Sequence, residues 1–138
     1  MYVVNTIKLS EQMDNLSDLS VLVIDDSYVN RQLMKTILDD EFKEVIEAGD
    51  GIEALEILES GIKPHLIILD LMMPVMDGVE TLRRIRKLGY AVPIIVVTAD
   101  IEGANRIKCL ELGVAAFINK PIYGTQVVRL INEVLKKQ

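Results

Sequence analysis

The stretch Leu66-Ile67-Ile68-Leu69-Asp70 decides the fold of this chain, because four consecutive branched apolar residues end in a carboxylate. An unbroken apolar run of this length is typical of a strand buried on both faces of a parallel sheet. The segment at residues 71–78, which contains Pro74 and ends in Asp77-Gly78, predicts that the strand stops at Asp70. We therefore expect a rigid strand end that holds the Asp70 carboxylate with its oxygens on the loop side.

Four further β-like runs surround this strand at nearly regular spacing. The five runs are Val21–Ile24, Val45–Ala48, Leu66–Leu69, Ile94–Val97 and Ala115–Ile118. Their starts lie 24, 21, 28 and 21 residues apart, which leaves room for one crossover helix in each interval. The segment Glu44–Ala48 alternates between polar and apolar residues, so it is predicted to form an edge strand.

Each interval, and the segment after the last run, carries apolar residues at the spacing of a helix that packs on one face. These residues are Val29, Leu33, Met34, Ile37 and Leu38; Ile52, Leu55 and Leu58; Val79, Leu82 and Ile85; Ile101, Ala104, Ile107 and Leu110; and Val127, Leu130, Ile131 and Val134 in a last helix from about Gln126 to Lys136. Ser27 or Asp26 is expected to cap the first helix. Gly61, Gly89 and Gly113 are expected to end the next three. Strict strand–helix alternation with right-handed crossovers predicts a doubly wound α/β sandwich.

Length and composition exclude several classes of protein. The chain has 138 residues, a net charge of −6 and one cysteine, Cys109. This length suits one domain, and we place an N-terminal extension at residues 1–18 and the domain at residues 19–138. The acidic charge, without any basic stripe, argues against direct nucleic-acid binding. No apolar run approaches the roughly 18 residues of a membrane span, no secretory signal is recognisable, and a single cysteine fits a reducing cytoplasm.

Every predicted strand except the edge strand is followed by polar residues that can carry chemistry. The first run leads into Asp25 and Asp26, the third into Asp70, the fourth into Thr98 and the fifth toward Lys120. Because ligands of doubly wound sheets bind at the carboxyl ends of the strands, we expect these side chains to meet at one edge. The three carboxylates sum to −3 and Lys120 adds +1, so one divalent cation would neutralise the remaining −2. Without it, repulsion would favour protonation of a carboxylate.

The types of ligand in this set indicate which cation is expected. Oxygen ligands without His or Cys favour Mg²⁺, or Mn²⁺, over zinc. Mg²⁺ is commonly bound through one or two carboxylates together with a phosphate oxygen. We therefore expect the site to accept a phosphoryl group, whose other oxygens Lys120 and Thr98 would contact.

Four motifs at these strand ends resemble those of the receiver domains of two-component response regulators, the fold of the chemotaxis-type receivers. They are Val21–Ser27, Leu69–Pro74 with Asp77-Gly78, Val97–Ala99 and Phe117–Pro121. The resemblance extends from about Leu19 to Lys137. It implies a flavodoxin-like fold with five parallel strands in the order 2-1-3-4-5 and helices on both faces.

The resemblance also implies roles for single residues. Asp70 would be the phosphoacceptor, taking a phosphoryl group from a histidine kinase or a histidine phosphotransfer protein. The Mg²⁺ ligands would be Asp25, Asp26, Asp70 and the main-chain carbonyl of Met72. Lys120 would pair with Asp70 and then with the phosphoryl group.

Two further residues would form the switch that the resemblance implies. Thr98 would move toward the phosphoryl group, and Phe117 would turn into the space that Thr98 leaves. This change would shift the population between two packings of the face made by the last two helices and the strand between them, where a downstream effector would bind. The Lys120–Pro121 peptide bond is expected to be cis.

The chain also departs from the family pattern, and two other functions stay open. Receivers that dimerise through that face often carry acidic residues where this chain has Ala115-Ala116, so we expect a monomer or a weak dimer. We expect self-catalysed phosphoryl transfer and autodephosphorylation, without turnover of external substrates. One alternative is a receiver fold that binds partners independently of phosphorylation. The other is an aspartyl-phosphate phosphatase of the haloacid-dehalogenase type, which needs a second acid where this chain has Met72.

Overall fold

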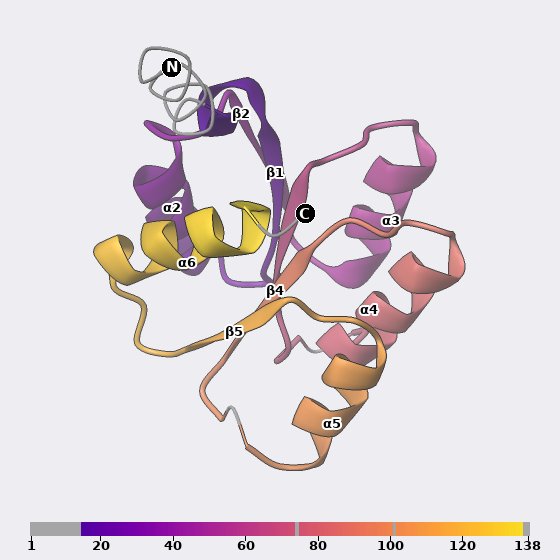
Figure 1. Cartoon of the computed structure of the whole chain (residues 1–138). Coiled ribbons are helices and arrows are strands. Elements are labelled where there is room, and N and C mark those ends of the chain that lie inside the picture. The colour runs from indigo at the N-terminus through magenta and orange to yellow at the C-terminus, as the bar shows by residue number, and fades with distance from the viewer. Residues whose placement is uncertain (1–14, 74, 101, 137–138) are drawn as a thin grey trace, which may run out of the picture.

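The computed structural model describes residues 15–73, 75–100 and 102–136, and in them one parallel sheet lies between two layers of helices (Figure 1). The strands are β1 (Ser20–Ile24), β2 (Glu44–Ala48), β3 (Leu66–Asp70), β4 (Ile94–Thr98) and β5 (Ala116–Asn119). The helices are the short 3₁₀ helix η1 (Asn15–Asp18), α2 (Tyr28–Leu38), α3 (Gly51–Glu59), α4 (Gly78–Lys87), α5 (Ala104–Glu111) and α6 (Gly124–Lys136). The sheet order is β2-β1-β3-β4-β5, and all four pairings are parallel. This confirms the predicted flavodoxin-like fold.

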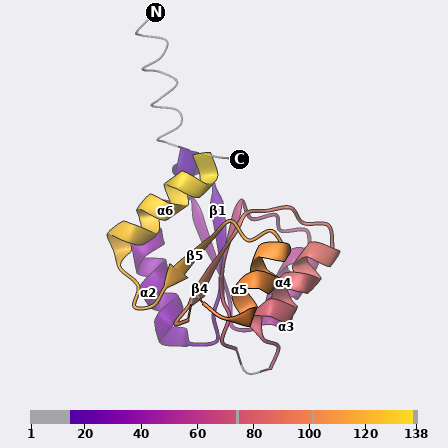
Figure 2. The ribbon, with the colours of Figure 1, turned by 60° about the horizontal axis from the view of Figure 1, so that its bottom comes forward.

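The two faces of the sheet are covered by different helices. In both views α2 and α6 lie on one side of the sheet, and α3, α4 and α5 on the other (Figures 1 and 2). The side chains of β1 alternate between these layers: Leu22 and Ile24 belong to the core under α3, α4 and α5, while Val21 and Val23 belong to the core under α2 and α6. Two-sided burial explains why the central strands are continuously apolar. The alternating strand β2 lies at the edge, as predicted.

Several apolar residues of the predicted helical stripes are exposed in the structure. Val29 and Leu33 of α2 are exposed, because Met34 and Leu38 occupy the inward face of that helix. On α5, Ile107 is 62% exposed and Leu110 is 50% exposed. The remaining two exceptions are the exposed Ile52 of α3 and Ala104 of α5, while Ile101 lies outside the described residues. The sequence pattern located these helices but did not give their rotation on the sheet.

The α5 helix is held to the sheet by a narrow contact. Cys109 is its buried residue and belongs to the core under α3, α4 and α5. Phe117 of β5 lies against Arg106 of this helix, and β5 is the last strand of the sheet, so no further strand extends the core there. The exposed side chains of Ile107 and Leu110 therefore give this helix an apolar surface that faces solvent.

The segment before β1 contributes to the core within the described residues. Leu16 of η1 is buried and belongs to the same core as Phe42 and Val23. The positions Leu9 and Met13, which share a helical spacing with Leu16 in the sequence, lie outside the described residues. Within the described ranges, no helix combines the length and apolar character needed to cross a membrane.

Gly78 closes the loop that follows β3, and the backbone leaves no space there for a side chain. Its N–H donates a hydrogen bond of 3.0 Å to the carbonyl of Leu71. A Cβ atom at this position would lie 2.5 Å from the Cα of Leu71 and 2.7 Å from the carbonyl oxygen of Asp70. Backbone atoms cannot rotate away as a flexible side chain can, so the close return of the chain requires glycine.

We predict that Gly78→Ala lowers the free energy of unfolding by about 1–3 kcal/mol, the usual cost of forcing atoms into a packed site. Gly124→Ala is the matched control, because its Cβ would meet Ile37 at an ordinary 3.6 Å. Urea denaturation of both variants measures the difference. Equal stability of the two variants would contradict the steric argument.

Candidate metal centre

Three carboxylates meet at the carboxyl edge of the sheet, as the sequence predicted. Asp70 ends β3, and Asp25 and Asp26 follow its neighbour β1. Each of the three side chains offers an oxygen, and these oxygens lie within 4.8 Å of one another. Asp70 is 3% exposed and Asp25 is 7% exposed, whereas Asp26 is open to solvent. The adjacent parallel strands bring together acids that lie 45 residues apart in sequence.

Backbone N–H groups hold the two buried carboxylates in place. The N–H of Ser27 donates a hydrogen bond of 2.8 Å to Oδ1 of Asp25, and the N–H of Met72 donates one of 3.2 Å to Oδ1 of Asp70. Ser27 also caps α2, because its hydroxyl accepts a hydrogen bond from the N–H of Asn30. The start of α2 therefore orients Asp25 through the same residue that begins the helix.

Lys120 supplies the positive charge that the sequence predicted beside the acids. Its Nζ lies 3.4 Å from Oδ1 of Asp70, and its side chain is partly buried. The N–H of Lys120 donates to the carbonyl of Thr98, so the end of β4 positions the lysine backbone. The Lys120–Pro121 bond is cis, which confirms the expectation.

The electrostatics of this cluster act most clearly on Asp25. Burial raises the pKa of its carboxyl above the ordinary value, and the hydrogen bond from Ser27 opposes this rise. The negative charges of Asp70 and Asp26 add to the increase in the pKa, while Lys120 opposes it. A site in which burial and neighbouring charge disfavour an ionised carboxylate gains stability when a cation enters.

The donor set fits Mg²⁺ on chemical grounds. Three carboxylates face one small space, and one lysine cannot neutralise them. Hard oxygen ligands match Mg²⁺ or Mn²⁺. The N–H of Met72 anchors that residue to Asp70, and the role of its carbonyl as a ligand stays a prediction.

Thr98 lies at the end of β4 but is engaged away from the acids. Its hydroxyl donates a hydrogen bond of 3.3 Å to the carbonyl of Asp100 and accepts one of 3.2 Å from the N–H of the same residue. Phe117 of β5 is partly buried, and the guanidinium of Arg106 lies 4.8 Å from the centre of its ring. Each of the two predicted switch residues thus has a distinct local partner.

Sequence reasoning missed one residue that contacts this edge. Arg31 of α2 donates a hydrogen bond of 2.7 Å from Nη1 to the main-chain carbonyl of Asp25. No spacing rule identified it, because an arginine in an exposed turn of a helix usually faces solvent. The signal was available only from the packing of α2 against β2.

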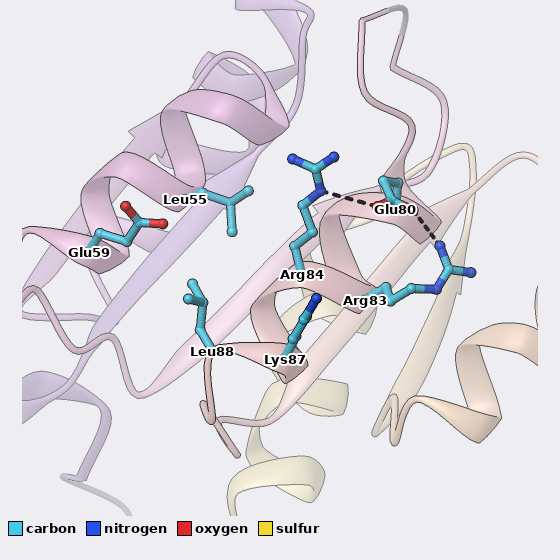
Figure 3. A pocket seen from close by; sticks show the side chains of 7 residues that line it. All are labelled: Leu55, Glu59, Glu80, Arg83, Arg84, Lys87 and Leu88. Atoms are coloured by element: carbon cyan, nitrogen blue, oxygen red, sulfur yellow. Dashed lines mark hydrogen bonds and ion pairs between the residues drawn. The ribbon is translucent and has the colours of Figure 1, made fainter.

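A groove of about 590 Å³ lies between α3 and α4, and Figure 3 shows the side chains that line it. Its lining residues are Leu55, Glu59, Glu80, Arg83, Arg84, Lys87 and Leu88. Arg84 pairs with Glu80 at 3.1 Å, and Arg83 pairs with the same carboxylate. These hydrogen bonds, chiefly that from Arg84, lower the pKa of Glu80. Exposed pairs within one helix contribute little stability, and the groove contains none of the predicted site residues.

The comparisons with known proteins agree with this geometry. The chain matches the response regulator receiver domain over residues 21–132. It is 38% identical over 127 residues to the transcriptional regulatory protein ResD of Bacillus subtilis, and this alignment covers 91% of this chain and 51% of ResD. It is 33% identical over 115 residues to the chemotaxis protein CheY of Halobacterium salinarum, covering 83% of this chain and 95% of CheY.

A solved structure gives the same result at the level of the fold. The CheX–CheY–BeF₃–Mg complex of Borrelia burgdorferi aligns with a TM-score of 0.78 and 27% identity, covering 85% of this chain and 89% of that chain. The chain therefore belongs to the receiver domain family of two-component response regulators, which confirms the resemblance. It spans about half the length of ResD and about a tenth of the sensor kinases that it also matches.

We predict that Asp25→Asn raises the free energy of unfolding of the metal-free protein at neutral pH, because it removes a charge that burial disfavours. Because the pKa of Asp25 is raised in the folded state, the free-energy cost of ionising this carboxyl on folding is present in full above that raised pKa. This cost is lost as the pH falls through the raised pKa and then through the ordinary pKa of Asp. Below both values the Asp25 carboxyl of wild type is protonated in the folded and in the unfolded protein.

Urea denaturation in chelator-containing buffer at several pH values measures this gain. Asp40→Asn, at an exposed carboxylate after α2, is the control for removal of one charge. A gain from Asp25→Asn that is absent at neutral pH, or that grows toward acid pH, would contradict the argument.

Proposed function

We propose that this receiver domain takes a phosphoryl group from a phosphohistidine onto Asp70, with Mg²⁺ bound, and thereby switches a partner-binding face. The observation that carries this proposal is the position of the Asp70 carboxylate. It is buried at the end of β3, shares a space with two other acids, and lies 3.4 Å from the Lys120 ammonium group. A carboxylate in this setting is a nucleophile whose surroundings counter the charge of an incoming phosphate.

The proposed transfer is a displacement at phosphorus. A carboxylate oxygen of Asp70 forms a bond to phosphorus, and the bond between phosphorus and the donor imidazole nitrogen breaks. The products are an acyl phosphate on Asp70 and a free imidazole on the donor. Mg²⁺ held by Asp25, Asp26, Asp70 and the Met72 carbonyl would supply positive charge to the phosphoryl oxygens. Lys120, whose Nζ lies 3.4 Å from Oδ1 of Asp70, would contact a further phosphoryl oxygen.

The switch would follow from a change of partner at Thr98. For its hydroxyl to donate to a phosphoryl group on Asp70, the hydrogen bond that it donates to the carbonyl of Asp100 has to break. Phe117 would then turn inward and leave the Arg106 guanidinium. Such a change would shift the population of molecules between two packings of the face made by α5, β5 and α6. The free energy gained from the contacts with the phosphoryl group would set the size of this shift.

The partner-binding face would include α5, β5 and α6. The exposed Ile107 and Leu110 of α5 offer it an apolar surface, and a hollow of about 160 Å³ beside it is lined in part by Phe117, Tyr123 and Leu130. Exposed apolar groups of this kind favour contact with another protein. The CheX–CheY complex of Borrelia burgdorferi, which contains BeF₃ and Mg, supports a partner protein that binds a receiver in the presence of a phosphoryl mimic.

The remaining parts of the proposal concern partners and location. The donor would be a histidine kinase or a histidine phosphotransfer protein, and the reader a downstream effector protein or domain. We further propose a cytoplasmic monomer or weak dimer without direct nucleic-acid or membrane binding. Residues 19–138 would form the receiver domain, and residues 1–18 its N-terminal extension.

We predict that Asp70→Asn abolishes phosphoryl incorporation, because an amide oxygen cannot form the acyl phosphate. The measurement is intact-protein mass after incubation with acetyl phosphate and Mg²⁺, with Asp40→Asn as a control that keeps the site unchanged. Wild type and control should each gain one phosphoryl group. Incorporation in Asp70→Asn equal to that of wild type would refute the assignment.

We predict that Thr98→Val uncouples the site from the α5–β5–α6 face. In wild type, beryllofluoride with Mg²⁺ should shift the amide resonances of this face, because the phosphoryl mimic attracts the Thr98 hydroxyl. These shifts should be largely lost in Thr98→Val. Thr36→Val, which removes a hydroxyl that only bonds within α2, should respond like wild type. A wild-type spectrum insensitive to beryllofluoride would instead support phosphorylation-independent binding.

A further inference from the structure

The guanidinium group of Arg31 joins three elements beside the acid cluster. Nη1 donates a hydrogen bond of 2.7 Å to the carbonyl of Asp25, which follows β1. Nε forms an ion pair of 3.3 Å with Glu47 of the edge strand β2. The group also lies 5.7 Å from the centre of the Tyr28 ring. Although α2 is a surface helix, the Arg31 side chain is only 16% exposed.

The position of Arg31 is itself fixed by a second residue of α2. The side-chain amide of Gln32 donates a hydrogen bond of 2.9 Å to Oε1 of Glu47, the same oxygen that pairs with Arg31. Arg31 is therefore held in one place, and Glu47 matches its charge.

The contact with Asp25 completes the anchoring of that residue. Its N–H donates to the carbonyl of Ala48 at 3.1 Å, and its carboxylate accepts from the N–H of Ser27. Arg31 binds the third polar group, the main-chain carbonyl. This carbonyl belongs to the peptide unit that links Asp25 to Asp26, so the contact sets the orientation of that peptide plane.

The orientation of this peptide plane matters most for Asp26. Asp26 is exposed, so packing does little to direct its side chain. The direction of its Cα–Cβ bond follows from the preceding peptide plane, and its carboxylate is one of the three in the cluster. A rotation of this plane changes the backbone dihedral angles on both sides of it and so shifts the Asp26 side chain relative to Asp25 and Asp70.

We propose that Arg31 is a positioning residue of the metal centre, which orients the Asp25–Asp26 peptide unit and so directs the Asp26 carboxylate at a bound divalent cation. The inference rests on the proposed function in that it takes the cluster to bind Mg²⁺. Groups that orient metal ligands from outside typically change metal affinity 10–100-fold when they are removed. The forked guanidinium suits this role, since it binds Asp25 and Glu47 with different nitrogens.

Isothermal titration of the full chain with Mg²⁺ alone, without phosphodonor, tests the proposal. We expect both Arg31→Met and Arg31→Lys to bind Mg²⁺ about 10–100-fold more weakly than wild type. Lysine retains the charge but cannot make the two contacts at once. Arg84→Met is the matched control, because it removes the same charge from an exposed ion pair on α4, and its affinity should equal that of wild type.

Glu47→Gln serves as a milder variant if Arg31→Met does not fold. It keeps the shape of the side chain and weakens the hold on Arg31, so a smaller loss of Mg²⁺ affinity is expected. Wild-type affinity in both Arg31→Lys and Glu47→Gln would overturn the role of Arg31. Loss in Arg31→Met with full affinity in Arg31→Lys would assign the effect to charge and would also overturn positioning.

A separate outcome concerns the proposed function itself. Wild type should bind Mg²⁺ and Asp26→Asn should bind it more weakly. A wild-type protein that takes up no Mg²⁺ would overturn the metal centre. Binding in wild type that Arg31 variants leave unchanged would remove only the inference about Arg31.

Discussion

The concentration of negative charge at the carboxyl edge of the sheet is the constraint on which this molecule depends. Three carboxylates share a small space with one lysine, and two of the acids are buried. Parallel pairing of β1 with β3 makes this proximity unavoidable, because both strands end at the same edge. Burial raises the pKa of the Asp25 carboxyl, and the charges of Asp70 and Asp26 add to this rise. The cluster is unfavourable without positive charge, and this supports the proposed cation site.

The surrounding structure keeps this unfavourable cluster from relaxing. Main-chain N–H groups of Ser27 and Met72 hold the buried carboxylates, and Gly78 lets the loop after β3 return against its own backbone. Arg31 adds a contact from α2 and the edge strand. These restraints come from neighbouring loops and helices, so the site is preorganised by elements that also stabilise the fold. Preorganisation of this kind lets a bound ion or phosphoryl group find its ligands without a large reorganisation.

The β4–β5 side of the sheet and the helix α5 have fewer restraints than the acid cluster, and this suits a switch. On α5 the buried contact is Cys109, while Ile107 and Leu110 face solvent. Thr98 and Phe117 each engage a local partner, Asp100 and Arg106 respectively. Weak local contacts of this type can be exchanged for phosphoryl contacts at small cost in free energy. A rigid acid cluster beside a lightly held helix is the physical arrangement that a phosphorylation-dependent population shift requires.

The sequence by itself determined the strands, their parallel direction and the convergence of the acids, while the order of the strands came from the resemblance to receiver domains. Continuous apolar runs that end in Asp25-Asp26 and Asp70 specify buried parallel strands, and parallel strands bring their ends together. The positions of Lys120 and the cis bond to Pro121 followed from the family motifs. These features depend on local residue patterns or on topology, and both can be inferred from the amino-acid sequence.

Only the tertiary structure decided how the helices are rotated and which side chains reach between elements. Ile107 has the spacing of a core residue but is exposed, and no strand beyond β5 extends the core there. Arg31 looks like an ordinary surface arginine, and it contacts Asp25 because α2 packs beside Glu47 of β2. Such contacts depend on the orientation of packed elements in three dimensions, and residue periodicity along the chain does not encode it.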